Sequence, residues 1–69
     1  MGTLAKNLKQ LRQKHGLTQS QVADGVGISV NSYRQFEKGL RSRGVDTLIR
    51  FAEFYEVSTD FLLGLRLDP

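Results

Sequence analysis

Apolar residues recur every three or four positions through most of the chain, and short polar or glycine-containing breaks separate the apolar runs. This spacing places apolar side chains on one face of a helix. No segment shows the strict alternation of apolar and polar residues that is typical of a strand. The pattern therefore predicts an all-α fold with five helices, at about residues 3–15, 18–26, 29–38, 45–56 and 58–63.

Signals for helix ends agree with these ranges. Thr18 stands three residues before Gln21, which is the spacing of a capping box, and Ser29 and Ser58 are good N-cap residues. Thr3 is the expected cap of the first helix. Glycines follow or break the helical pattern at Gly16, Gly27, Gly39 and Gly64. Gly25 is an exception, because it lies inside the second predicted helix, where glycine is a weak helix former.

Length and composition indicate one small domain that spans residues 1–69. The chain has no cysteine and one histidine, which excludes a disulfide scaffold and gives no basis for a zinc site. No apolar run approaches the roughly 20 residues of a membrane-spanning helix. We expect a cytoplasmic protein that does not contact a membrane and has no cofactor or small-molecule ligand. His15 has no accompanying constellation of catalytic side chains, so no enzyme is expected.

Charge is distributed unevenly along the chain. Residues 1–43 carry a formal charge of +6, whereas residues 44–69 carry −3. A basic surface on a small domain favours a polyanionic partner, although charge by itself says nothing about the fold.

The segment "TQSQVADGVGISVNSYRQFEKG" resembles the helix-turn-helix of the Cro and phage-repressor (XRE) family of DNA-binding domains. The likeness runs from "LKQLRQKHGLTQ" to "FAEFYEVSTDFLLG", and it implies a compact, five-helix, lambda-repressor-like fold. In that fold Ala23 lies where two helices cross closely, and Gly27 lies in the tight turn between them. Two features depart from the family pattern. Tyr33 stands where a β-branched residue is usual, and Arg43-Gly44 replaces a proline that commonly precedes the fourth helix.

The resemblance also implies roles for individual residues. The third helix would enter the major groove, where amide, guanidinium and apolar groups read base edges. The implied base-reading residues are Val30, Asn31, Ser32, Arg34 and Gln35. The implied phosphate contacts are Gln19, Lys38, Arg41, Ser42 and Arg43. Arg12 and Glu37 match a structural pair that links the first helix to the end of the third.

These features together predict a transcriptional regulator, most simply a repressor, that binds a palindromic operator in double-stranded DNA as a homodimer. The apolar C-terminal segment with Leu63, Leu65 and Leu67 is the expected dimer surface. Two other interpretations remain open. The polar face of the third helix is an ordinary solvated surface in many proteins. The same fold also serves protein-binding modules such as antitoxins or antirepressors, because a fold does not fix a function.

Overall fold

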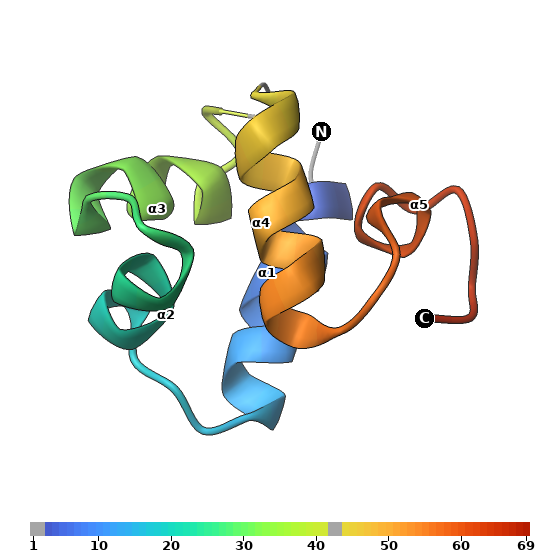
Figure 1. Cartoon of the computed structure of the whole chain (residues 1–69), viewed down its shortest axis with the longest axis horizontal. Coiled ribbons are helices and arrows are strands. Elements are labelled where there is room, and N and C mark those ends of the chain that lie inside the picture. The colour runs from blue at the N-terminus through green and yellow to red at the C-terminus, as the bar shows by residue number, and fades with distance from the viewer. Residues whose placement is uncertain (1–2, 42–43) are drawn as a thin grey trace.

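The computed structural model describes residues 3–41 and 44–69. All regular secondary structure in these residues is helical, which confirms the expected all-α fold. The five helices are α1 (Thr3–Lys14), α2 (Gln19–Val26), α3 (Val30–Glu37), α4 (Val45–Tyr55) and α5 (Thr59–Leu62). Figure 1 shows α2 and α3 on one side of α4, and α5 with the C-terminal end on the other side.

Side-chain caps start three of the helices. The Thr18 hydroxyl accepts a hydrogen bond from the Gln21 backbone N–H (3.1 Å), and the Gln21 side chain accepts one from the Thr18 backbone N–H (2.8 Å). This reciprocal pair is a capping box. Ser29 and Ser58 cap α3 and α5 in the simpler way, each through its hydroxyl.

Two helix ends have features that the sequence did not predict. Thr3, which was expected to be the N-cap that precedes the first helix, is itself the first residue of α1. At the other end of the fold, α4 stops at Tyr55, because Glu56 adopts the left-handed conformation with a φ of 55°. A non-glycine residue rarely adopts this conformation, so the sequence offered no stop signal at Glu56.

The core fixes the orientation of α3. Tyr33 and Phe36 are the buried residues of this helix, and both rings meet Phe51 of α4 edge-on, with centroids 5.8 and 5.2 Å away. Edge-to-face contacts of this kind add to the free energy gained from burying apolar area. The large Tyr33 ring, which departs from the family pattern, is therefore tucked fully inside. The side of α3 that is opposite these two rings is free to face solvent.

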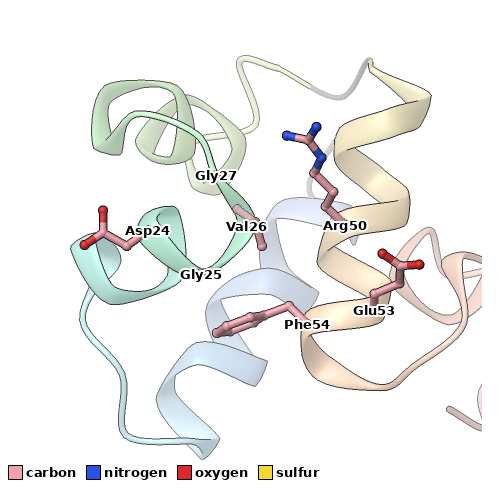
Figure 2. Close-up of a pocket in the computed structure, with 7 residues that line it drawn as sticks. All are labelled: Asp24, Gly25, Val26, Gly27, Arg50, Glu53 and Phe54. Atoms are coloured by element: carbon pink, nitrogen blue, oxygen red, sulfur yellow. The ribbon is translucent and has the colours of Figure 1, made fainter.

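Gly25 has a packing reason for its place inside α2. Figure 2 shows the Phe54 ring reaching from α4 toward the backbone of α2 at this residue. A Cβ atom at position 25 would lie 2.2 Å from Phe54 Cε1, far inside van der Waals contact. The absence of a side chain at Gly25 thus lets α4 cover the end of α2. An open hollow remains beside this contact, with Asp24, Arg50 and Glu53 around it.

Candidate nucleic-acid interface

The outward side of α3 presents hydrogen-bonding side chains. Asn31, Arg34 and Gln35 are all exposed, and Lys38, the C-cap residue, continues the row. These residues follow helical spacing, so their side chains lie on the face of α3 that is opposite Tyr33 and Phe36. An amide and a guanidinium on one face can each form paired hydrogen bonds with the edge of a base.

Val30 and Ser32 lie differently from the other residues expected to read bases. Val30 is half-buried and packs against the edge of the core. Ser32 is also half-buried, and its hydroxyl accepts a hydrogen bond from the capping residue Ser29 (3.1 Å). Part of each side chain is therefore already occupied within the protein.

Arg12 and Glu37 form a close ion pair that joins α1 to the last residue of α3. Arg12 Nε lies 2.6 Å from Glu37 Oε2, and Arg12 Nη2 donates to Oε1 at 3.2 Å. The Glu37 side chain is only 5% exposed. The Tyr33 hydroxyl also donates to Glu37 Oε2. A carboxylate that is so little exposed and accepts from several donors fixes the end of α3 against α1.

The pKa values of these groups follow from their surroundings. Burial would raise the pKa of Glu37, but hydrogen bonds from Arg12, Tyr33 and Gln19 outweigh it, and the pKa lies below its ordinary value. Burial, reinforced by the adjacent Glu37 carboxylate, raises the pKa of the Tyr33 hydroxyl. The hydrogen bond to Glu37 likewise raises the pKa of Arg12. At neutral pH the pair is therefore ionised, and Tyr33 is a neutral donor.

Gln19 extends this cluster to the outward side of α3. Its Nε2 donates to Glu37 Oε1 (3.2 Å), and its Oε1 accepts from Arg34 Nε (3.2 Å). Arg34 Nη1 in turn lies 3.5 Å from Asn31 Oδ1. A continuous polar chain thus leads from the Arg12–Glu37 pair to two of the residues expected to read bases.

The residues expected to contact phosphate are only partly described. Lys38 and Arg41 are exposed and lie at and beyond the end of α3. Ser42 and Arg43 lie outside the described residues. Gln19 is half-buried and uses both ends of its amide inside the protein, so only its second N–H remains for a phosphate oxygen.

Sequence analysis did not predict how Tyr33 and Gln19 join the polar chain. Tyr33 was considered only for the size of its ring, without a partner for its hydroxyl. Gln19 was considered only as a contact to the DNA phosphate backbone. For Tyr33 the sequence does hold a signal. A hydroxyl on the buried, apolar face of a helix needs a hydrogen-bond partner inside the protein. The partner of Tyr33 is Glu37, four residues along the same helix, whereas the partners of Gln19 depend on the packing of α2 against α3.

Two further kinds of site were considered in the described residues, around His15 and among possible metal ligands. The His15 ring packs on Tyr55 with centroids 5.4 Å apart, which gives this histidine a packing role. Among the described residues, no three acidic, histidine or cysteine side chains are grouped to hold a metal ion. No helix in the part of the chain that the structure describes is long and apolar enough to cross a membrane.

Comparison with known proteins decides the family. A family model described as Helix-turn-helix matches residues 8–62. The chain belongs to the Helix-turn-helix family. The matched segment runs from α1 to the end of α5, so α2 and α3 are its helix-turn-helix and α3 is the second helix of that unit. The predicted resemblance to Cro and phage-repressor domains is thereby confirmed.

Relatives within the helix-turn-helix family are named as regulators. The HTH-type transcriptional regulator ImmR of Bacillus subtilis is 42% identical over 62 residues, which cover 90% of this chain and 49% of ImmR. The cryptic phage CTXphi transcriptional repressor RstR of Vibrio cholerae is 36% identical over 77% of this chain and 48% of RstR. The antitoxin PezA of Streptococcus pneumoniae also matches, with 36% identity.

A solved structure shares the helix-turn-helix fold. The crystal structure of a transcriptional regulator from Listeria innocua matches with a TM-score of 0.82 and 30% identity, over 88% of this chain and 57% of that one. The chain spans about half the length of ImmR and of RstR. The shared part is the helix-turn-helix domain.

Proposed function

We propose that this chain binds double-stranded DNA sequence-specifically and acts as a transcriptional repressor. The observation that carries the proposal is the outward face of α3, the second helix of a helix-turn-helix, where Asn31, Arg34 and Gln35 stand exposed in one row. In this arrangement the second helix enters the major groove with such side chains against base edges. Asn31 and Gln35 suit adenine, and Arg34 suits guanine. Val30 and Ser32 would contribute through the parts that remain exposed.

The basic residues around α3 would hold the DNA backbone. Lys38 and Arg41 are exposed at the end of this helix, and we assign the same role to Ser42 and Arg43, which follow in the sequence. The formal charge of +6 on residues 1–43 supports attraction to a polyanion. Gln19 would add a phosphate contact from the first turn of α2. These contacts position the protein and do not select a sequence.

The operator would be palindromic and the protein a homodimer, because one recognition helix covers only a few base pairs. Half-sites would then lie about one helical turn, roughly 34 Å, apart. Leu63, Leu65 and Leu67 are exposed, and α5 and the C-terminal end lie on the other side of α4 from α2 and α3 (Figure 1). Such a surface would be free to join two copies while both recognition helices face DNA. Equilibrium sedimentation that detects only monomer, with and without operator DNA, would remove this dimer.

Selection from a random double-stranded DNA library at near-physiological salt tests the proposal. We expect enrichment of a motif with dyad symmetry. Changing Gln35 to Ala should then reduce discrimination at one base pair by about 1–3 kcal/mol. Changing the exposed Arg41 to Ala is the matched control, because it should weaken binding to all duplexes equally and reduce the salt slope by about one.

A protein-binding module of the antitoxin kind is the alternative. This alternative is supported by the match to a relative that is named as an antitoxin, PezA. It would be supported if the library yields no motif and only weak, salt-sensitive binding persists. Equal losses on every sequence for Gln35→Ala would also contradict the base-reading role of that residue.

A further inference from the structure

One side-chain amide connects the buried ion pair to the recognition face. Gln19 lies between Glu37 and Arg34, at 3.2 Å from an oxygen of the first and 3.2 Å from Nε of the second. Arg34 is 15 residues away from Gln19 in sequence, so only the packing of α2 against α3 brings the two side chains together.

The chemistry of the neighbours fixes which way the Gln19 amide points. Glu37 is an ionised carboxylate that accepts from Arg12 and Tyr33 and has no proton to donate. The amide must therefore turn its NH₂ group toward Glu37, which leaves its carbonyl oxygen facing Arg34. An arginine has no acceptor, so the two contacts agree with a single orientation of the amide. A flipped amide would break both hydrogen bonds.

Glu37 is held by more contacts than a surface carboxylate. Its side chain is 5% exposed and receives two hydrogen bonds from Arg12 and one from Tyr33, which belong to α1 and α3 respectively. An acceptor fixed in this way transmits its position through Gln19 to the exposed Arg34. The hydrogen bond to Gln19 Oε1 occupies only the Nε–H group of Arg34. At the tip of the guanidinium, Nη1 also lies 3.5 Å from Asn31 Oδ1. The second N–H of Nη1 and both N–H groups of Nη2 remain available for the two acceptors of a guanine.

We propose that Gln19 is a positioning residue for sequence reading: it holds the guanidinium of Arg34 at one place on the outward face of α3. An arginine has a long side chain with many rotamers, and restricting it before binding reduces the entropy lost when it pairs with a base. Gln19 then influences the choice of one base pair without touching it. This inference rests on the proposed sequence-specific DNA binding and goes beyond a phosphate contact from the same residue.

The test compares Gln19→Met, Arg34→Ala and the double variant by measuring dissociation constants on the selected operator and on each of its single-base-pair changes. Methionine has a similar length and good helix propensity but forms neither hydrogen bond. Ser20→Ala is the matched control, because Ser20 is exposed in the same turn of α2. Far-UV circular dichroism at the assay temperature establishes that each variant is folded.

We expect Arg34→Ala to reduce discrimination at one base pair by roughly 5- to 150-fold. Gln19→Met should reduce discrimination at the same base pair by roughly 2- to 10-fold. In the Arg34→Ala background, Gln19→Met should cause no further loss of discrimination, because its effect passes through Arg34. Ser20→Ala should leave discrimination unchanged.

A second readout uses the free protein. In a ¹⁵N NMR spectrum the Arg34 Nε–H should exchange more slowly with water in the wild type than in Gln19→Met, because only the wild type has an acceptor for it. Unchanged exchange would overturn the inference without reference to DNA. A loss from Gln19→Met that is equal on all sequences would overturn it too, since that is the behaviour of a phosphate contact alone.

The experiment separates failure of the inference from failure of the proposed function. If Arg34→Ala changes no base preference while Gln35→Ala does, sequence-specific binding stands and the inference about Gln19 fails. If the wild-type protein itself shows no preference among sequences, the proposed function fails, and the inference about base choice fails with it.

Discussion

Replacing Gly25 by alanine should destabilise this protein, although the change favours a helix. In a helix interior, alanine is more favourable than glycine by about 1 kcal/mol. At position 25, however, the new Cβ would lie 2.2 Å from Phe54 Cε1 and 2.9 Å from Cδ1 and Cζ of the same ring. The Phe54 ring must move, because two non-bonded carbon atoms cannot approach this closely.

The cost of moving the ring follows from its burial. Phe54 is 37% exposed, so most of its surface is covered. Full burial of a phenylalanine side chain is worth about 1.5–3 kcal/mol, and the covered part accounts for about 1–2 kcal/mol. Displacement also weakens its edge-on contact with Tyr55, at a centroid distance of 5.0 Å, which adds about 0.5–1.5 kcal/mol. Against the helix gain of about 1 kcal/mol, we expect a net loss of about 0.5–2.5 kcal/mol.

A double-mutant cycle decides whether the ring is responsible. With Phe54 changed to Ala, the space beside Gly25 is free, and Gly25→Ala should then stabilise the protein by about 1 kcal/mol. Urea unfolding followed by far-UV circular dichroism provides the four free energies of unfolding. Effects of glycine on the unfolded chain are common to both backgrounds and cancel. Equal stabilisation by Gly25→Ala in both backgrounds would refute the packing explanation.

Three further substitutions test other features of the fold. Glu56→Gly should raise the free energy of unfolding by about 0.5–1 kcal/mol in urea titrations, because Glu56 has a φ of 55° that costs glycine little; a loss of stability would contradict this. Tyr33→Phe keeps the buried ring but removes a donor to Glu37, and it should cost about 1 kcal/mol by the same assay. Glu37 has a lowered pKa, so its stabilising effect is present above its ordinary pKa of 4.5 and is lost as the pH falls through the lower folded value. Thermal unfolding from neutral to strongly acidic pH should therefore show a smaller acid-induced loss for Glu37→Gln than for the wild type, and parallel curves would contradict this.

Local signals were sufficient to predict the helices. The apolar spacing and the capping residues Thr18, Ser29 and Ser58 act within a few residues, and the caps they predicted are present. The end of α4 was placed one residue late, since Glu56 adopts a left-handed conformation without being glycine. The overall fold came from resemblance to a family, because helical spacing alone does not determine how helices pack.

The candidate site could be predicted only in part. Outward positions such as Asn31 and Gln35 follow from helical periodicity once the inward residues are known. The link between Gln19 and Arg34 depends on side-chain conformations in two helices, and no local pattern encodes it. The reason for Gly25 was likewise out of reach, because its partner Phe54 lies far along the chain in α4.

The attachment of α3 has a consequence for how such a protein diversifies. This helix is held by two inward rings, Tyr33 and Phe36, that both meet Phe51, whereas Asn31 and Gln35 contribute nothing to the core. Exposed substitutions of this kind usually change stability by less than about 0.5 kcal/mol. Mutation can therefore explore new outward chemistry at little risk to folding. The packed core of the fold and the exposed residues of α3 can therefore evolve at different rates.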